Sequence, residues 1–182
     1  MTRHNDATMG GSMDRIALIT SRDDLAADAR AAYDRIVESR GEIPRPFQVL
    51  LHAPEMAGRV AELGHVLRFE SHLPDADREL VTLATGRARG CSFVWESHLQ
   101  AAVAAGIPPD TIAKLEGDPR GLSEREGVLV SFVDELCETG AVSDRTFRAV
   151  HGLLGTPGVV ELVLTIGYYT MLGYVMSACD AC

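Results

Sequence analysis

Apolar residues recur at helical spacing along most of the chain, in runs that end at glycine, proline or capping residues. No stretch alternates apolar and polar side chains with period two for long, and the segment ends carry helix caps instead of hairpin turns. A period of 3.6 builds an apolar stripe on one face of a helix, whereas a strand needs a period of two. The pattern therefore predicts an all-α fold, a single-domain bundle of about seven helices over residues 14–178.

Caps and breakers predict the ends of the first helices. The first helix is expected to open at Ser21 and to end at Gly41, before a rigid, non-helical linker through Pro44 and Pro46. The next is expected to start at Pro54. Its predicted inward face carries Met56, Val60, Leu63, Val66 and Leu67.

Similar signals divide the C-terminal half. A minor helix is predicted over residues 109–116, and Ser123 with Glu126 predicts a capping box at the start of the next one. Ser143 is expected to cap another helix, which runs to Leu154. A separate, long last helix is then expected to open at Thr156-Pro157.

The charge balance restricts the partners of the chain. Seventeen basic residues against twenty-six acidic ones give a net charge of −9, and no run of Lys or Arg occurs. Nucleic acid and anionic membrane surfaces are therefore not expected as partners. The uncharged stretch from Leu162 to Ala178 is at the short end of what can span a bilayer, and no basic residues flank it. It is interpreted as a helix in the core or at a subunit interface.

The N-terminal residues 1–13 are polar, are expected to be disordered, and lack the apolar middle region of a signal peptide. We therefore expect a cytoplasmic protein whose four cysteines are reduced. Cys179 and Cys182 form a Cys-x-x-Cys in a tail of residues 179–182, which is interpreted as frayed. The alternative is that this tail supplies a resolving thiol to Cys91. No metal or cofactor site is expected, because a zinc site needs four ligands and no second pair exists.

Most of the chemistry lies between Asp77 and Gly106, which the pattern predicts to form two helices meeting at Gly90. Glu79 falls on the first helix, and Cys91 lies at the N-terminal turn of the second, where the helix dipole favours an anion. His98 follows seven residues later, on nearly the same face but about 10 Å further along the axis. Direct proton transfer between the thiol and the imidazole is therefore too long without a bridging water or Glu79.

Each of these residues taken alone also has a structural interpretation. A cysteine is among the side chains most often buried as a small hydrophobe, and a helix histidine is commonly a core or surface residue with a satisfied N–H. Glu79 could be an exposed first-turn acid that favours the helix dipole. Their joint spacing is what favours a site.

The order Glu79, Cys91 and His98, with Phe93 and Trp95 between the last two, resembles the carboxymuconolactone decarboxylase family of the alkylhydroperoxidase D-like (AhpD-like) superfamily. The resemblance extends over roughly residues 30–178. It includes Arg78-Glu79-Leu80, Ala104-Ala105-Gly106-Ile107, Val142-Ser143-Asp144 and Ile166-Gly167-Tyr168-Tyr169.

The resemblance implies an all-α subunit that assembles into homo-oligomeric rings, trimers or hexamers, acts on a small-molecule substrate and needs no cofactor. In the hydroperoxidase branch the second helix begins Cys-x-x-Cys, and the pair reduces peroxide while a glutamate and a histidine relay protons. Here Val94 replaces the second cysteine, so local disulfide chemistry is not available.

In the decarboxylase branch a lactone that bears a carboxylate loses carbon dioxide and its ring carbon is reprotonated. The resemblance then implies Glu79 and His98 as proton shuttle and donor. Phe93 and Trp95 are expected to contact the substrate, and Arg87 and Arg89 are candidates to bind its carboxylate.

Three functions remain open from the sequence. The first is a carboxymuconolactone decarboxylase-like lyase that uses acid–base chemistry on a small lactone or organic acid, with Glu79, Cys91 and His98 as catalytic residues. The second is a thiol-dependent peroxidase with peroxiredoxin-type activity at Cys91. The third is a non-catalytic oligomeric binding protein that keeps only the fold.

Overall fold

The computed structural model describes residues 15–181. Within them the chain forms helices and no strands, so the all-α prediction is confirmed. The predicted disordered segment 1–13 lies outside the described residues. The eight α-helices are α1 (Arg30–Arg40), α2 (Arg45–Leu50), α3 (Pro54–His65), α4 (Asp75–Ala88), α5 (Ser92–Ala104), α6 (Pro109–Glu116), α7 (Glu124–Thr139) and α8 (Asp144–Ala178). Three shorter helical segments are η1 (Arg22–Asp24), the π-helical η2 (Val66–Glu70) and η3 (Pro119–Gly121).

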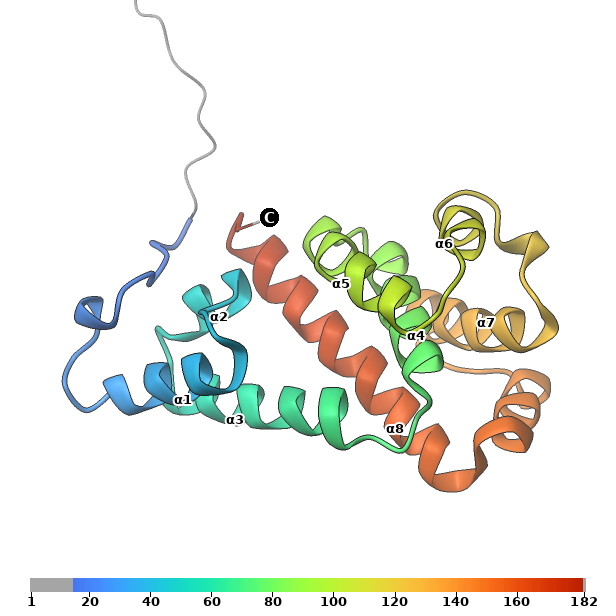
Figure 1. The fold of residues 1–182 in the computed structure, drawn as a ribbon, viewed down its shortest axis with the longest axis horizontal. Coiled ribbons are helices and arrows are strands. Elements are labelled where there is room, and N and C mark those ends of the chain that lie inside the picture. The colour runs from blue at the N-terminus through green and yellow to red at the C-terminus, as the bar shows by residue number, and fades with distance from the viewer. Residues whose placement is uncertain (1–14, 182) are drawn as a thin grey trace, which may run out of the picture.

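The long helix α8 organises the molecule. In Figure 1 it runs diagonally between the N-terminal helices α1 to α3 on one side and α4 to α7 on the other. Helix α4 packs against α5, α7 and α8, and helix α1 packs against α3. The chain therefore has a larger C-terminal helical group and a smaller N-terminal one, which α8 connects.

Three clusters of buried side chains follow this division. One fills the space among α4, α5, α7 and α8, and a second lies among η1, α1, α2 and α3. The third cluster contains Leu67, Cys91, Val94, Tyr168, Tyr169 and Leu172. Because its members come from η2, α5 and α8, this third cluster lies where the two groups meet.

Helices α4 and α5 form an antiparallel hairpin, as the sequence predicts. Gly90, with a φ of 59°, makes the turn between them, and Gly106 ends α5 with a φ of 89°. At Gly86 the helices approach closely, because a Cβ there would lie 3.1 Å from the backbone nitrogen of Trp95 and 3.2 Å from Val94 Cγ1. This contact sets the register in which α4 and α5 face each other.

The predicted caps of the C-terminal half are confirmed. Ser123 and Glu126 form the capping box of α7, and Ser143 caps α8. Helix α6 spans the predicted residues. The expected break before Pro157 is present as a kink at Gly155, whose φ of 66° and ψ of 179° interrupt the helical backbone inside α8.

Two predictions about the N-terminal elements were wrong. Ser21 does not open α1; it closes a capping box with Asp24 around η1, and the chain is extended at Leu25 before α1 begins. The linker after Gly41 is not wholly non-helical, since Pro46 lies in the first turn of α2, where its missing N–H leaves no hydrogen bond unmade.

The predicted inward face of α3 was also wrong in part. Met56, Leu63 and Val66 are exposed, whereas the small residues at 57, 61 and 64 are buried. Small side chains let α3 lie close to α1, so the contact face is defined by alanine and glycine instead of by the largest apolar residues.

Helix α8 is the one helix within the described residues that is long and apolar enough to cross a membrane by length and composition. One such helix is weak evidence for a span, and a core helix passes the same test. Its buried side chains include Leu162, Ile166, Leu172 and Met176, and it packs against α4 and α7. These contacts are those of a core helix.

Candidate functional site

The α4–α5 hairpin places the imidazole of His98 against the carboxylate of Glu79. The distance from His98 Nδ1 to Glu79 Oε2 is 2.8 Å, and the two residues are 8% and 4% exposed. Two of the three residues predicted for the site are therefore in direct contact, although nineteen positions separate them in sequence.

This contact determines how the imidazole can act. An ionised Glu79 accepts a hydrogen bond from Nδ1–H, which leaves Nε2 as the nitrogen that can accept a proton or return one. No other hydrogen bond to His98 is formed by the described residues. On its other side Glu79 has an arginine, with Arg78 Nε 3.5 Å from Glu79 Oε1. The carboxylate thus lies between a cation and the imidazole.

Two tyrosines of α8 cover the imidazole. The ring of Tyr169 meets that of His98 edge-on, with centroids 4.8 Å apart, and Tyr168 meets Tyr169 in the same way at 5.2 Å. Burial raises the pKa of Tyr169 well above its usual range, and the opposing charge of Arg68 is too weak to cancel this effect. Burial also raises the pKa of Tyr168. Both hydroxyls therefore stay protonated at neutral pH.

His98 opens into a cavity of about 530 Å³. The wall combines aromatic rings with three arginines from the N-terminal half, and its residues include Arg40, Arg45, Phe47, Arg68, Phe93 and Tyr168. This volume suits a small organic molecule. Two larger hollows, of about 980 and 1010 Å³, lie along α1 and α3 and contain none of the predicted site residues.

Cys91 does not share this cavity. It is the N-cap residue of α5, as expected, but only 2% of it is exposed and it is absent from the cavity wall. Its Sγ packs against α8, 3.7 Å from the point that a Cβ on Gly173 would occupy. His98 meets α8 at Tyr169, one helical turn earlier. The thiol and the imidazole therefore contact successive turns of α8.

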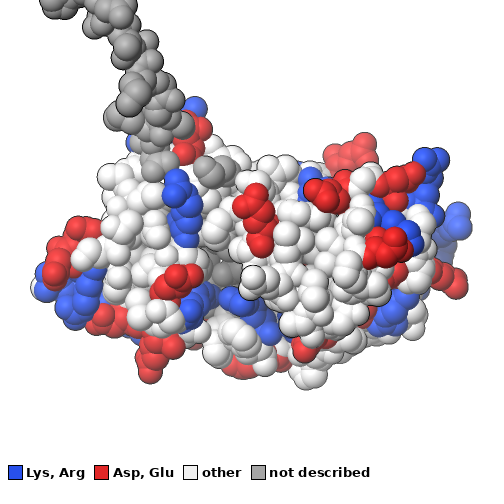
Figure 2. Space-filling model, turned by 45° about the horizontal axis from the view of Figure 1, so that its top comes forward, with Lys and Arg blue, Asp and Glu red and all other residues white. Residues whose placement is uncertain are grey.

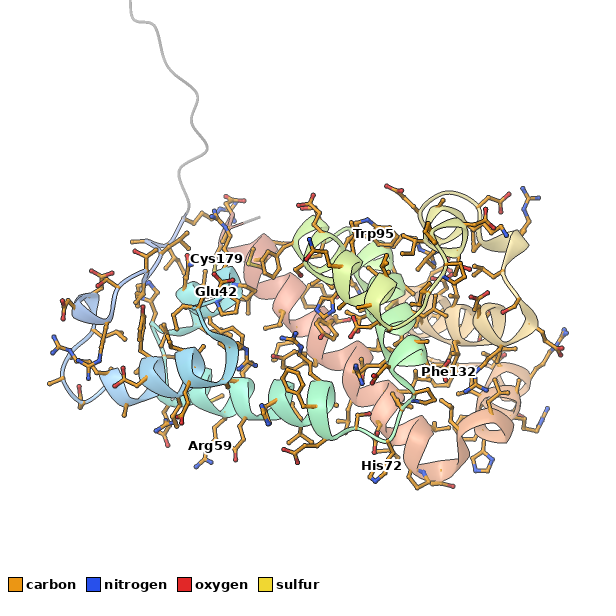
Figure 3. The ribbon with its side chains drawn as sticks, in the orientation of Figure 1. Glu42, Arg59, His72, Trp95, Phe132 and Cys179 are labelled. Atoms are coloured by element: carbon orange, nitrogen blue, oxygen red, sulfur yellow. The ribbon has the colours of Figure 1, made fainter. Side chains whose placement is uncertain are left out.

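Of the two aromatic residues predicted to contact the substrate, only one lines the cavity. Phe93 lines the cavity. Trp95 does not; its ring packs against the large C-terminal core, and Figure 3 places it on α5 at the side nearer to α6.

Arg87 and Arg89 do not face the cavity either. Arg87 donates to the carbonyl of Leu115 and forms an ion pair with Asp134, while Arg89 donates to the carbonyl of Cys137. Both guanidinium groups connect the α4–α5 turn to the C-terminal helices. Their expected role in binding a carboxylate has no support in the structure.

Sequence reasoning missed the arginines that do line the cavity. Arg40 is at the end of α1, Arg45 begins α2 and Arg68 lies in η2. Arg40 and Arg45 are far from the Glu79–His98 segment in sequence, and no spacing motif links Arg68 to that segment. Tyr168 and Tyr169 had one signal, the Ile-Gly-Tyr-Tyr segment on which the resemblance partly rested.

The C-terminal tail is ordered as far as the structure describes it. Ala181 is fully buried; its N–H donates to the carbonyl of Met176 and its carbonyl accepts from Arg45 Nε at 2.6 Å. The interpretation of residues 179–181 as frayed was therefore wrong, while Cys182 lies outside the described residues. Cys179 is six residues beyond Gly173, about 9 Å further along α8. Cys179 therefore lies beyond the turn of α8 that Cys91 contacts.

No group of three or more His, Cys, Asp or Glu side chains in the described part of the chain could hold a metal ion. The Glu79–His98 pair has an arginine as its next neighbour instead of a third ligand. The pair is therefore suited to proton transfer.

Comparison with known proteins agrees with this picture. Residues 54–118 match the model of the carboxymuconolactone decarboxylase family, and this segment contains both Glu79 and His98. No curated protein sequence matches the chain.

Solved structures share the fold at low identity. One, described as an alkylhydroperoxidase AhpD core and an uncharacterised peroxidase-related protein from Ralstonia eutropha, has a TM-score of 0.75 at 16% identity over 93% of this chain and 91% of that one. An uncharacterised peroxidase-related protein from Silicibacter has a TM-score of 0.75 at 16% identity, over 96% and 93%. The apo debrominase Bmp8 has a TM-score of 0.75 at 15% identity, over 93% and 92%. Similar folds therefore occur in proteins described by different activities.

Proposed function

We propose that the chain is an enzyme that transfers protons to and from a small lactone or organic acid, with His98 as the acid–base group; the match of residues 54–118 to the carboxymuconolactone decarboxylase family and the AhpD-like fold support this proposal. The observation that carries the proposal is the 2.8 Å contact between His98 Nδ1 and Glu79 at the wall of a cavity. A carboxylate that orients an imidazole in this way sets its tautomer and stabilises its protonated form.

The reaction that fits best is decarboxylation of a lactone that bears a carboxylate on its ring. The bond between the ring carbon and the carboxylate breaks, its electron pair moves into the unsaturated ring carbonyl system, and carbon dioxide leaves. A proton then adds to the ring, so that one carboxylate and one proton become one C–H bond and carbon dioxide. His98 Nε2–H supplies that proton, and Glu79 stabilises the imidazolium from which it comes.

The surroundings of His98 support this chemistry. The low exposure of both members of the pair strengthens their electrostatic interaction relative to the same pair in water. The edge of Tyr169 holds the imidazole plane, and because Tyr169 remains neutral it adds no negative charge beside Glu79. Proton transfer by such a positioned group typically contributes about 10²–10⁴-fold in rate.

The test is a screen of carboxylated γ-lactones for carbon dioxide release, with wild-type protein and His98→Gln compared at several pH values. Ser97→Ala serves as the matched control, because Ser97 is the neighbouring cavity residue and has no contact with Glu79. We expect turnover that His98→Gln loses and Ser97→Ala retains. Equal rates for wild type and His98→Gln would refute the role of His98.

A second function, peroxide reduction at Cys91, is favoured by one observation: Cys91 is the N-cap of α5, where the helix dipole favours a thiolate. The sulfur would take one oxygen from the peroxide and become a sulfenic acid, while water or an alcohol leaves. An external dithiol would then reduce it to the thiol. The burial of Cys91 weighs against this function, since peroxide would have to pass its neighbours. Peroxide consumption that Cys91→Ser abolishes would establish it.

The same proposal includes assembly into a homo-oligomer. Helix α8 presents apolar side chains to solvent along one stripe, at Val160, Val163, Leu164 and Tyr174. Exposed apolar stripes of this kind are typical of subunit contacts. Light scattering coupled to size-exclusion chromatography tests this assembly, and a monomer at micromolar concentration would contradict it.

A further inference from the structure

We propose that Arg40 and Arg68 bind an anionic group of the substrate, a carboxylate, in the same cavity that His98 lines. The inference rests on the proposed function only in taking this cavity as the substrate site. It replaces Arg87 and Arg89, whose guanidinium groups are held by α6 and α7.

The guanidinium of Arg40 is held in place by uncharged partners. Arg40 Nη1 donates to Ser39 Oγ at 2.7 Å, and Nη2 donates to the carbonyl of Ala61 at 3.0 Å. The group also lies over the ring of Phe47, 4.8 Å from its centroid. No carboxylate in residues 15–181 forms an ion pair with it. An oriented arginine without a counter-ion at a cavity wall is a ready partner for an anion.

Arg68 comes from a different element and points to the same cavity. It lies in η2 and stacks over the ring of Phe69, 5.1 Å from its centroid. Its positive charge acts on both Tyr168 and Tyr169, where it opposes the effect of burial on their pKa values. Within the described chain it too has no ion pair with a carboxylate. Arg45 is in a different position, because it already donates to the carbonyl of Ala181.

The charge of the cavity is opposite in sign to that of the protein. Among residues 15–181 the wall contains Arg40, Arg45 and Arg68 against a single side-chain carboxylate, that of Glu42, whereas the whole chain carries a net charge of −9. On a surface where acidic and basic side chains are interspersed, as on the face in Figure 2, such a local excess of positive charge favours an anion at this point.

Gly64 makes this arrangement sterically possible. A Cβ at this position would lie 2.1 Å from the hydroxyl oxygen of Tyr168 and 3.0 Å from Arg40 Nη2. The hydroxyl and the guanidinium therefore converge on a point that only glycine leaves open. Arg40 and Tyr168 both line the cavity, and their N–H and O–H donors suit the two oxygens of a carboxylate.

The probes for the test are 2-furoate, a small planar ring with a carboxylate, and 2-furamide, its neutral analogue. Their binding is measured by isothermal titration calorimetry. Wild-type protein is compared with Arg40→Met, with Arg68→Met and with the control Arg59→Met. The control removes the same charge from α3 at a side chain that Figure 3 shows directed away from the molecule. Thermal melts establish that each variant is folded.

We expect wild-type protein and Arg59→Met to bind 2-furoate alike, and each cavity variant to bind it about tenfold or more weakly, since an ionic hydrogen bond is lost. 2-Furamide should bind wild type at least about tenfold more weakly than 2-furoate does. If Arg40→Met does not fold, Arg68→Met and the pair of probes still decide. Any of three results would overturn the proposal. Wild type could bind the two probes with equal affinity, 2-furoate could show no saturable binding, or the cavity variants could bind it like Arg59→Met.

His98→Gln separates this inference from the proposed function. It should bind 2-furoate as wild type does while lactone turnover is lost. Retained turnover in His98→Gln with selective furoate binding would refute the proton-transfer role and leave the anion site standing. Turnover that depends on His98 without selective furoate binding would do the reverse.

Discussion

Helix α5 carries the two reactive side chains of the candidate site, Cys91 at its N-cap and His98 near its middle, and their surroundings differ. At the N-cap, Cys91 is buried against Gly173 of α8 and is absent from the cavity wall. Two turns later His98 faces the cavity and has a carboxylate at 2.8 Å. A cysteine at a helix N-terminus is therefore not sufficient for a reactive thiol, because access to a substrate decides whether its position matters.

The difference follows from the residues of α8 that contact Cys91 and His98. Glycine at position 173 lets α8 approach Cys91 closely and close the space around the sulfur. Tyr169, one turn earlier, packs edge-on against His98, which lies beside a cavity to which α1, α2 and η2 also contribute. We therefore infer that His98 takes part in the reaction and that Cys91 contributes to packing.

The largest effect is expected from Glu79→Gln, which tests the role of His98 through its carboxylate partner. The amide keeps the shape of the side chain but removes the charge that stabilises protonated His98, so lactone turnover should fall by about 10²-fold. Asp75→Asn is the control, because it removes an exposed carboxylate from the same helix. Steady-state kinetics measure both, and equal loss in the two variants would contradict a specific role for Glu79.

Gly64→Ala should have the next largest effect. The added methyl group would displace the Tyr168 hydroxyl and the Arg40 guanidinium, so we expect turnover to fall roughly tenfold, mainly through a higher KM, because misplaced binding groups weaken substrate positioning. Gly127→Ala is the control, since nothing lies within 4 Å of a Cβ there. A normal KM in Gly64→Ala would show that these groups do not bind the substrate.

Cys91→Ala tests the packing role of Cys91 and should change lactone turnover by less than about twofold. Removing the buried sulfur leaves a small void, so the free energy of unfolding should fall by about 1 kcal/mol. Denaturant unfolding and the lactone assay measure the two effects on one preparation. A large loss of turnover in a folded Cys91→Ala variant would show that Cys91 takes part in the reaction.

The smallest effect is expected from Tyr169→Phe, and it appears only at alkaline pH. Burial raises the pKa of Tyr169 in the folded protein above its value in the unfolded chain. The stability that depends on the neutral hydroxyl is therefore complete below the unfolded pKa of about 10 and is lost as pH rises above it. Wild type should lose more stability than Tyr169→Phe between about pH 10 and 12, as chemical denaturation would measure. Parallel pH curves would contradict the buried, neutral state of this tyrosine.

Local patterns predicted the central hairpin and the positions of Glu79 and His98 on its two helices. Gly90 and Gly106 delimit α5 as expected, and the contact between Glu79 and His98 follows from two helices joined by one tight turn. These features depend on residues close in sequence, for which caps and helical periodicity are reliable guides.

Features that depend on distant segments could not be predicted. Arg40 and Arg68 reach the cavity because α1 packs against α3 and η2 packs against α8, and no motif near His98 indicates them. The buried face of α3 was misassigned for a related reason. Periodicity of large apolar residues favoured Met56 and Leu63, whereas close packing on α1 selects alanine and glycine.

The most direct test of the account follows proton transfer itself. A carboxylated γ-lactone, such as carboxymuconolactone, is incubated in D₂O with wild type, His98→Gln or Cys91→Ala, and NMR detects deuterium on the ring carbon of the product. We expect deuterated product with wild type and Cys91→Ala, and a rate about 10²–10⁴-fold lower with His98→Gln. Product formation that survives in His98→Gln and disappears in Cys91→Ala would contradict it.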